Sequence, residues 1–147
     1  MKILIIKNDG FGDLIIIKEL LKKINKEKNE IDIVLSKNNE IFFNELTNIQ
    51  NKYVFDLYGS NFNIKKNVSK KDKKLLKKLN NKSYDLCIVL RRYLNTEQVA
   101  ILNHINTKKI FLCHQFFNSK IELKKKFFKI NVPKHHVNDY DYFFYFL

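Results

Sequence analysis

The sequence contains little of several residue types that identify particular classes of protein. Its 147 residues include only two cysteines, Cys87 and Cys113, and both lie inside apolar runs. This excludes a disulfide framework and favours the reduced, buried thiols of a cytoplasmic protein. No apolar stretch reaches the roughly 20 residues that a membrane span needs, and the chain starts with the strand-like MKILII rather than a basic leader.

Several catalytic and cofactor-binding motifs are also missing. A dinucleotide-binding G-x-G-x-x-G loop would need a third glycine at Ile15 and an acid after the second strand, where Ser36 and Lys37 stand. The four histidines form no H-E-x-x-H pattern, and no serine lies in a G-x-S-x-G turn. We therefore expect no nicotinamide cofactor, no zinc site and no hydrolase of the nucleophile-elbow type.

Positive charge, by contrast, is in excess. The formal net charge is +13, and it is concentrated in residues 65–82, with nine lysines and one acid, and in residues 120–134, with six lysines and one acid. Such blocks can attract phosphates, nucleic acid or an anionic membrane surface. A solvated lysine face explains them as well. Aromatic residues are not interleaved with the lysines as nucleic-acid modules require, so nucleic acid is the less favoured partner.

Apolar runs alternate with amphipathic stretches along the chain. The runs predict strands at residues 2–6, 31–36, 52–58, 84–90 and 108–113. Helical spacing of apolar residues predicts helices at 12–28, 39–49, from Ser69 onward, at 95–105 and at 135–147. Strand and helix alternate five times, which predicts a single α/β domain over residues 1–147, with a doubly wound parallel sheet.

Two of the predicted helices carry clear start signals. Ser69 and Asp72 form an S-x-x-D pattern that resembles a capping box, with Val68 placed to staple the first turn. Asn95 stands at the cap position of the next helix, and Gln98 follows three residues later. Residues 114–134 show no regular period and contain Pro133, the only proline.

The loop after the first strand is the strongest candidate for a functional site. "KNDGFGDLII", residues 7–16, contains two of the three glycines, Gly10 and Gly12, where open α/β sheets bind ligands. Glycines let the backbone approach a ligand, and free N–H groups at the following helix favour an anion. Asp13 can stabilise that helix by about 0.3–1 kcal/mol, or accept a proton from an attacking hydroxyl. Asp9 admits the same two roles.

Three stretches carry a resemblance to a known family. "ILIIKNDGFGDLIIIKELL", "YDLCIVLRRYLNTEQVAILNHINTKKIFLC" and "HHVNDYDYFFYFL" resemble the heptosyltransferase-like glycosyltransferases of family 9, which elongate lipopolysaccharide cores and related surface glycans. The resemblance implies a Rossmann-like sheet, as in the N-terminal, acceptor-binding half of a GT-B enzyme. The chain matches that half only. The resemblance thus implies a donor domain outside this chain, lost by truncation or supplied by another polypeptide, and an isolated chain without activity.

The resemblance also implies roles for individual residues. Asp13 matches the aspartate taken as general base, with a nucleotide-sugar as co-substrate and no metal or other cofactor. The acceptor-binding candidates are Lys7, Asn8, Asp9, Gly10, Gly12, Arg91 and Arg92. Arg91 and Arg92 are the only arginines, and their planar guanidinium groups suit a phosphate or carboxylate of an anionic glycan or glycolipid. The family's acid near Val89 and its glycine at Cys113 are replaced, which leaves the acceptor's identity open.

Partners and location follow from the same features. The apolar ending, residues 142–147, predicts cover by a partner chain or by a further domain. The competing interpretation is a non-catalytic basic α/β module that binds nucleic acid or an anionic membrane surface. In both interpretations we expect a cytoplasmic protein, peripheral to the inner face of the membrane where it meets lipid.

Overall fold

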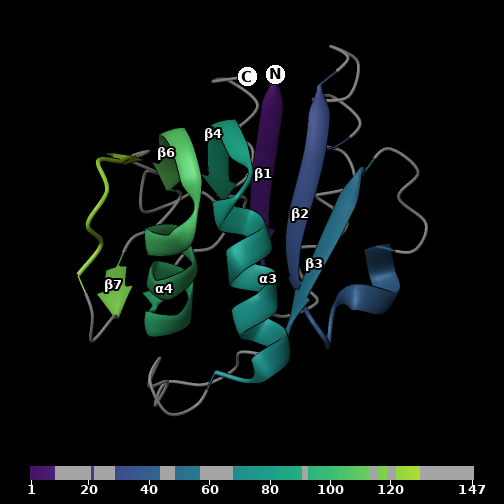
Figure 1. Cartoon of the computed structure of the whole chain (residues 1–147). Coiled ribbons are helices and arrows are strands. Elements are labelled where there is room, and N and C mark those ends of the chain that lie inside the picture. The colour runs from purple at the N-terminus through teal and green to yellow at the C-terminus, as the bar shows by residue number, and fades with distance from the viewer. Residues whose placement is uncertain are drawn as a thin grey trace, which may run out of the picture.

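A parallel β-sheet forms the centre of the computed structural model, which describes residues 1–8, 21, 29–43, 49–56, 68–90, 93–112, 116–118 and 122–129 (Figure 1). The strands of this sheet are β1 Lys2–Lys7, β2 Glu30–Ser36, β3 Asn51–Phe55, β4 Ser83–Val89, β6 Asn106–Leu112 and β8 Phe128–Lys129. Their spatial order is β3-β2-β1-β4-β6-β8, and every neighbouring pair is parallel.

The fold class predicted from the sequence, Rossmann-like α/β, is confirmed. Numbered along the chain, the six strands have the order 3-2-1-4-5-6 of dinucleotide-binding domains, with β1 at the centre. The ends of the five predicted strands differ from the observed ends by at most three residues. The sixth strand, β8, was not predicted, because two residues are too short to show a period.

Two helices cover one face of the sheet. They are α3 Lys70–Asn80 and α4 Thr96–His104, and they lie side by side in front of the strands in Figure 1. Both start signals are confirmed. Ser69 Oγ accepts a hydrogen bond from Asp72 N at 3.0 Å, and Asn95 N donates to Gln98 Oε1 at 2.9 Å. Each cap satisfies a backbone N–H that helix geometry leaves without a partner.

The other predicted helices are described only in part. The helix expected over residues 39–49 begins as a 3-10 turn, η2 Glu40–Phe43, and residues 44–48 lie outside the described part. Asn39 itself is not helical, because its side-chain amide closes the preceding turn: Oδ1 accepts from Ser36 N and Nδ2 donates to Lys7 O, each at 2.8 Å. Of residues 12–28 only Leu21 is described, helical and buried, and residues 135–147 lie outside.

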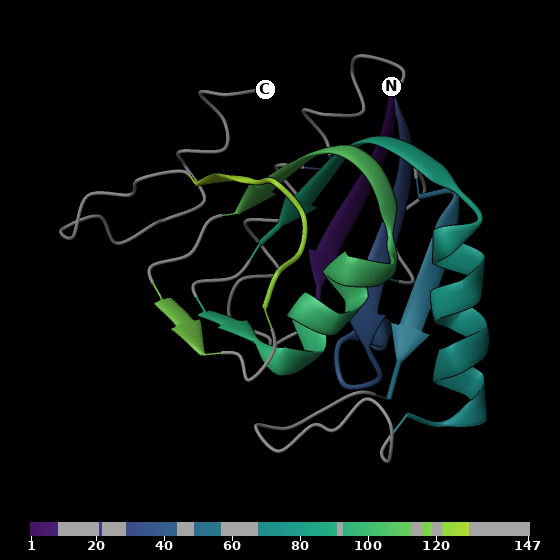
Figure 2. The ribbon, with the colours of Figure 1, turned by 60° about the vertical axis from the view of Figure 1, so that its left-hand side comes forward.

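A second, two-stranded sheet lies beside the main one. It pairs β5 Tyr93–Asn95 with β7 Phe116–Asn118 in parallel. Figure 2 shows it at the end of the molecule toward which the main strands point. This sheet was not predicted, because β7 falls in the stretch without a regular period.

The core between the sheet and its helices is apolar and closed. It contains Leu4 and Ile6 from β1, Cys87 from β4, and Val99 and Leu102 from α4, all with 2% exposure or less. Cys87 is a free thiol, as expected, and its burial raises its pKa. Cys113 lies outside the described residues.

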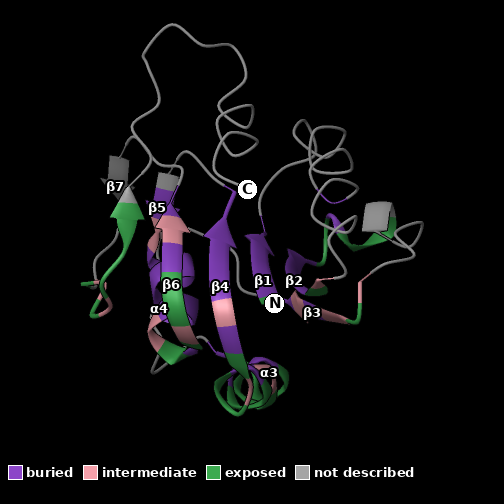
Figure 3. Cartoon of the chain, turned by 90° about the horizontal axis from the view of Figure 1, so that it is seen from above, coloured by how far each residue is buried: buried purple, intermediate pink, exposed green. Residues whose placement is uncertain are grey.

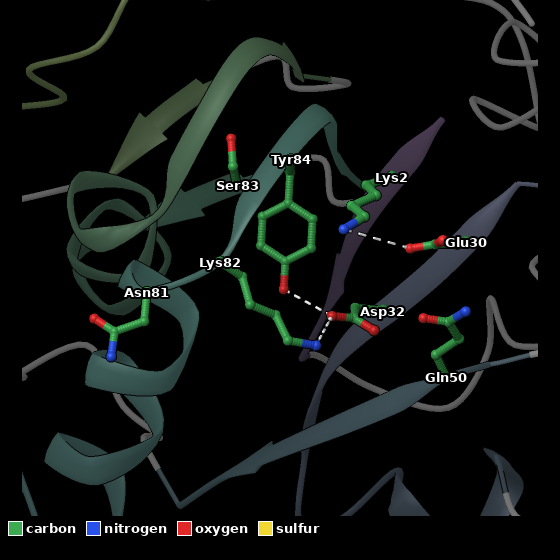
Figure 4. Close-up of a pocket in the computed structure, with 8 residues that line it drawn as sticks. All are labelled: Lys2, Glu30, Asp32, Gln50, Asn81, Lys82, Ser83 and Tyr84. Carbon is green, nitrogen blue, oxygen red and sulfur yellow. Dashed lines mark hydrogen bonds and ion pairs between the residues drawn. The ribbon is translucent and has the colours of Figure 1, made fainter.

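A buried carboxylate joins three strands at the amino end of the sheet. Asp32 of β2, 5% exposed, accepts hydrogen bonds from Tyr84 Oη at 2.8 Å, from Lys82 Nζ at 2.9 Å and from Asn51 Nδ2 at 2.7 Å. A polar hollow of about 260 Å³ lies beside this cluster. Tyr84 and Lys82 line the hollow, and both side chains point toward Asp32 (Figure 4). The three hydrogen bonds connect β2 to β3 and to the start of β4, so the cluster stabilises the sheet.

The protonation of this cluster follows from its surroundings. Burial and the hydrogen bond to Asp32 both raise the pKa of the Tyr84 phenol, which therefore stays neutral. Burial lowers the pKa of Lys82, but its bonds to Asp32 and Tyr53 outweigh burial, and the net shift is upward. Lys82 thus stays charged and faces the Asp32 carboxylate.

Asp32→Asn tests whether the charge of Asp32 holds this cluster together. The substitution keeps the shape but removes the charge that Lys82 and Tyr84 contact. We expect the free energy of unfolding, measured by urea denaturation, to fall by about 1–3 kcal/mol. Asp85→Asn is the matched control: Asp85 pairs with Lys108 at 2.6 Å on the surface, where an ion pair contributes little. Equal losses in both variants would contradict the assignment.

Candidate functional site

The carboxyl edge of the sheet has the geometry of a ligand site at β1. This strand pairs with β2 on one side and with β4 on the other, so the chain segments that follow β1 and β4 leave the sheet at a switch in strand order. Ligands of open α/β sheets bind in this crevice. Lys7 ends β1, Ser36 ends β2, and Leu90, after β4, donates its N–H to Ile6 O at 3.1 Å.

Two of the predicted site residues, Lys7 and Asn8, are placed at this edge. Asn8 Oδ1 accepts a hydrogen bond from Gln98 Nε2 at 2.8 Å, which joins the end of β1 to the first turn of α4. Both residues are buried, Lys7 at 0% exposure and Asn8 at 3%. Neither side chain therefore presents more than a trace of surface to an acceptor in this conformation, and the role of both in acceptor binding stays a prediction.

The other predicted site residues lie outside the described part of the chain. They are Asp9, Gly10, Gly12, Asp13, Arg91 and Arg92. The described residues fix only the points at which these segments start. The glycine loop leaves the sheet directly after Asn8, and the two arginines fall between β4 and β5.

Buried polar atoms without a partner gather at the same edge. Within the described residues, Asn8 Nδ2, Ser36 Oγ and Glu97 Oε2 have no hydrogen-bond partner, although each residue is 4% exposed or less. Nearly all buried polar atoms in folded proteins are bonded, and each unbonded one costs about 1–3 kcal/mol. Such groups are retained where water or a ligand supplies the missing partner. Here they come from the end of β1, the end of β2 and the start of α4.

The three groups form a mixed set of donors and acceptors. An amide N–H₂ donates, a carboxylate accepts, and a hydroxyl does either. Glu97 stands in the first turn of α4, where the helix dipole favours its negative charge, and its other oxygen lies 3.4 Å from Asn95 Nδ2. Hydroxyl groups can bond to any of the three, because a hydroxyl both donates and accepts.

Sequence reasoning missed Ser36 and Glu97. Ser36 was considered only as the position where a dinucleotide-binding acid is absent, and Glu97 only as part of the cap of a helix. A signal was present for both. Ser36 directly follows an apolar strand, and Glu97 lies in the first turn of the helix that follows β4 and β5, so both positions fall at the carboxyl edge.

The described residues contain no ready metal site and no membrane-crossing helix. No group of three or more His, Cys, Asp or Glu side chains converges in the ranges that the structure describes. None of the helices described there is long and apolar enough to cross a membrane. The expectation that the chemistry needs no metal stays a prediction.

Comparison with solved structures places this edge in a known type of fold. The crystal structure of the glycosyl transferase family 9 from Veillonella parvula DSM 2008 superposes with a TM-score of 0.66, over 95% of this chain and 38% of that chain. The chain has the fold of part of a glycosyl transferase. The two sequences are 14% identical, so the likeness shows the fold, and the chain spans under two fifths of the length of that neighbour. No family model and no curated protein matches.

Ser36→Ala, with Ser69→Ala for comparison, tests whether the hydroxyl at the carboxyl edge lacks a partner. Ser36→Ala removes a buried hydroxyl without a bond, so we expect the free energy of unfolding to stay unchanged or to rise by up to about 1 kcal/mol. Ser69→Ala removes a hydroxyl that caps α3, so we expect a fall of about 1 kcal/mol. Urea denaturation measures both. A loss at Ser36 as large as that at Ser69 would show that Ser36 Oγ has a partner.

Proposed function

We propose that this chain is the acceptor-binding half of a heptosyltransferase-like glycosyltransferase. The enzyme transfers a sugar from a nucleotide-sugar to a lipopolysaccharide core or a related surface glycan. One observation carries the proposal: Asn8, Ser36 and Glu97 hold unpartnered polar atoms at the switch point of the sheet, within a fold similar to part of a family 9 glycosyl transferase. A sugar offers hydroxyl groups that donate and accept hydrogen bonds, as these three side chains require.

In the proposed reaction, Asp13 acts as the general base. Its carboxylate takes the proton of an acceptor hydroxyl as that oxygen attacks the anomeric carbon of the donor sugar. The bond from that carbon to the nucleoside diphosphate breaks, and the diphosphate leaves with the electron pair. Asp13 follows Asn8 by five residues in the sequence, and Asn8 lies at the carboxyl edge.

In this proposal, side chains and backbone N–H groups near the carboxyl edge bind the acceptor. Asn8, Ser36 and Glu97 bond the hydroxyl groups of the sugar, and backbone N–H groups at Asp9, Gly10 and Gly12 meet an anionic group. Arg91 and Arg92, directly after Leu90, hold a phosphate or carboxylate of the glycan through bidentate bonds. Lys7, at the end of β1, adds positive charge.

The donor half belongs to another polypeptide or to a further part of the protein. This chain corresponds to 38% of the length of the glycosyl transferase that it resembles. In a GT-B arrangement the nucleotide-sugar binds mainly to the second domain, with no metal in this proposal. Transfer is then a property of the completed enzyme, whereas acceptor binding is a property of this chain.

Asp13→Asn tests the catalytic assignment. The chain is expressed together with a donor-side domain that restores sugar transfer. We expect the substitution to lower the transfer rate by about 10²–10⁴-fold, because the acceptor hydroxyl loses its base, while acceptor binding stays unchanged. Asp9→Asn is the matched control and should lower the rate far less. Transfer that is unchanged in Asp13→Asn would overturn the role of Asp13.

Glu97→Gln tests the acceptor site without any donor domain. The chain alone is titrated calorimetrically with a phosphorylated core oligosaccharide. Losing the charged acceptor of a hydroxyl hydrogen bond should weaken binding about tenfold or more. Glu122→Gln, which changes an exposed carboxylate, should leave binding unchanged. If both variants bind as the natural chain does, Glu97 does not contact the acceptor.

A further inference from the structure

The charged side chains on the solvent-facing side of α3 are all positive, and one of them, Lys71, pairs at 3.6 Å with Asp56, directly after β3. Six lysines of this helix are exposed: Lys70, Lys71, Lys73, Lys74, Lys77 and Lys78. The single acid of the helix, Asp72, is 1% exposed, and its carboxylate accepts a bond from Asp56 N at 3.2 Å. Viewed from above, α3 lies on the outside of the sheet with exposed residues along its outer surface (Figure 3). We call these six residues the lysine face.

This charge pattern opposes the stability of the helix. Lys70 and Lys74, Lys73 and Lys77, and Lys74 and Lys78 are like-charge pairs four residues apart, which repel on a helix surface. Lys70 and Lys71 also lie in the first turn, where the helix dipole disfavours a positive charge. A solvated face normally mixes both signs. A partner of opposite charge would offset this repulsion.

A hollow beside the lysine face combines apolar and cationic groups. It has a volume of about 360 Å³ and lies between α3 and α4, lined by Val68, Lys73, Leu76, Lys77, Asn80 and His104. Val68 and Leu76 are buried, at 8% and 7% exposure, whereas Lys73 and Lys77 are exposed. His104 Nδ1 lies 2.8 Å from Ala100 O, which leaves Nε2 for an outside contact. The buried apolar residues can contact the acyl chains of a phospholipid, and the exposed lysines can contact its phosphate.

We propose that the lysine face docks on a membrane surface rich in anionic phospholipids. Lysines are flexible point charges that suit such a diffuse negative layer, in which each one adds to binding. Duplex or single-stranded nucleic acid is disfavoured, because α3 contains no arginine for bidentate phosphate contacts and no aromatic residue for stacking on bases. This inference adds to the proposed function and does not rest on it, because it uses no residue of the carboxyl edge.

The test uses the full chain and vesicles of two compositions. One is phosphatidylcholine alone, and the other contains about 30% phosphatidylglycerol as the anionic lipid. We expect sedimentation with the anionic vesicles only. The triple variant Lys73→Gln, Lys74→Gln and Lys77→Gln should weaken this binding about a hundredfold, since each lysine contributes about fivefold. Circular dichroism confirms that the variant is folded.

A second triple variant separates the lysine face from overall charge. Lys109→Gln, Lys124→Gln and Lys126→Gln remove the same charge from exposed lysines outside α3. Binding that falls equally in both variants would overturn the proposal, and so would equal binding to uncharged vesicles. Duplex DNA is the third arm. If it binds more tightly than anionic vesicles and loses binding in the α3 variant, the face is a nucleic-acid surface instead. Transfer to a soluble acceptor, unchanged in the α3 variant, keeps this result separate from the proposed function.

Discussion

The position of β1 between β2 and β4 is the constraint on which the rest of the structure depends. Because β1 is hydrogen-bonded along both edges and covered on both faces, every residue from Ile3 to Asn8 is buried. A strand so enclosed offers contact to a ligand only at its ends: Lys2 lines the polar hollow at the amino end, and the segment with two glycines follows Asn8 at the carboxyl end. The same constraint makes the chain leave the sheet in opposite directions after β1 and β4, and the segments with Gly10 and Arg91 therefore begin beside one another.

The two ends of the sheet differ in whether their buried polar groups have hydrogen-bond partners. At the amino end, the buried Asp32 receives donors from Lys82, Tyr84 and Asn51, so the cluster is satisfied from within. At the carboxyl end, Asn8 and Glu97 each keep an unpartnered atom. A satisfied network rigidifies a fold, whereas an unsatisfied group lowers stability unless something binds it. The contrast supports placing the proposed site at the carboxyl end.

The sequence predicted those parts of the fold that local interactions determine. The caps at Ser69 and Asn95 were predicted because a cap and its partner lie three residues apart, and the strands because a buried strand is apolar throughout. The bond between Lys82 and Asp32 was missed because 50 residues separate them, and the basic block around Lys82 pointed to solvent. At the site, Lys7 and Asn8 were predicted from position alone. Ser36 and Glu97 were missed because the lack of a hydrogen-bond partner for a buried atom can be seen only in the folded structure.

Net charge links the two proposed surfaces but does not make them equivalent. A chain with a net charge of +13 attracts anionic partners, most strongly near its two lysine-rich blocks, and this attraction weakens as salt rises. The lysine face holds flexible exposed cations, so it can orient a partner only loosely, and salt screens it strongly. At the carboxyl edge, Asn8 and Glu97 are buried at element ends and selective for geometry, and burial protects their bonds from screening. Under the two proposals, the lysine face brings the chain to an anionic layer and the carboxyl edge selects the glycan.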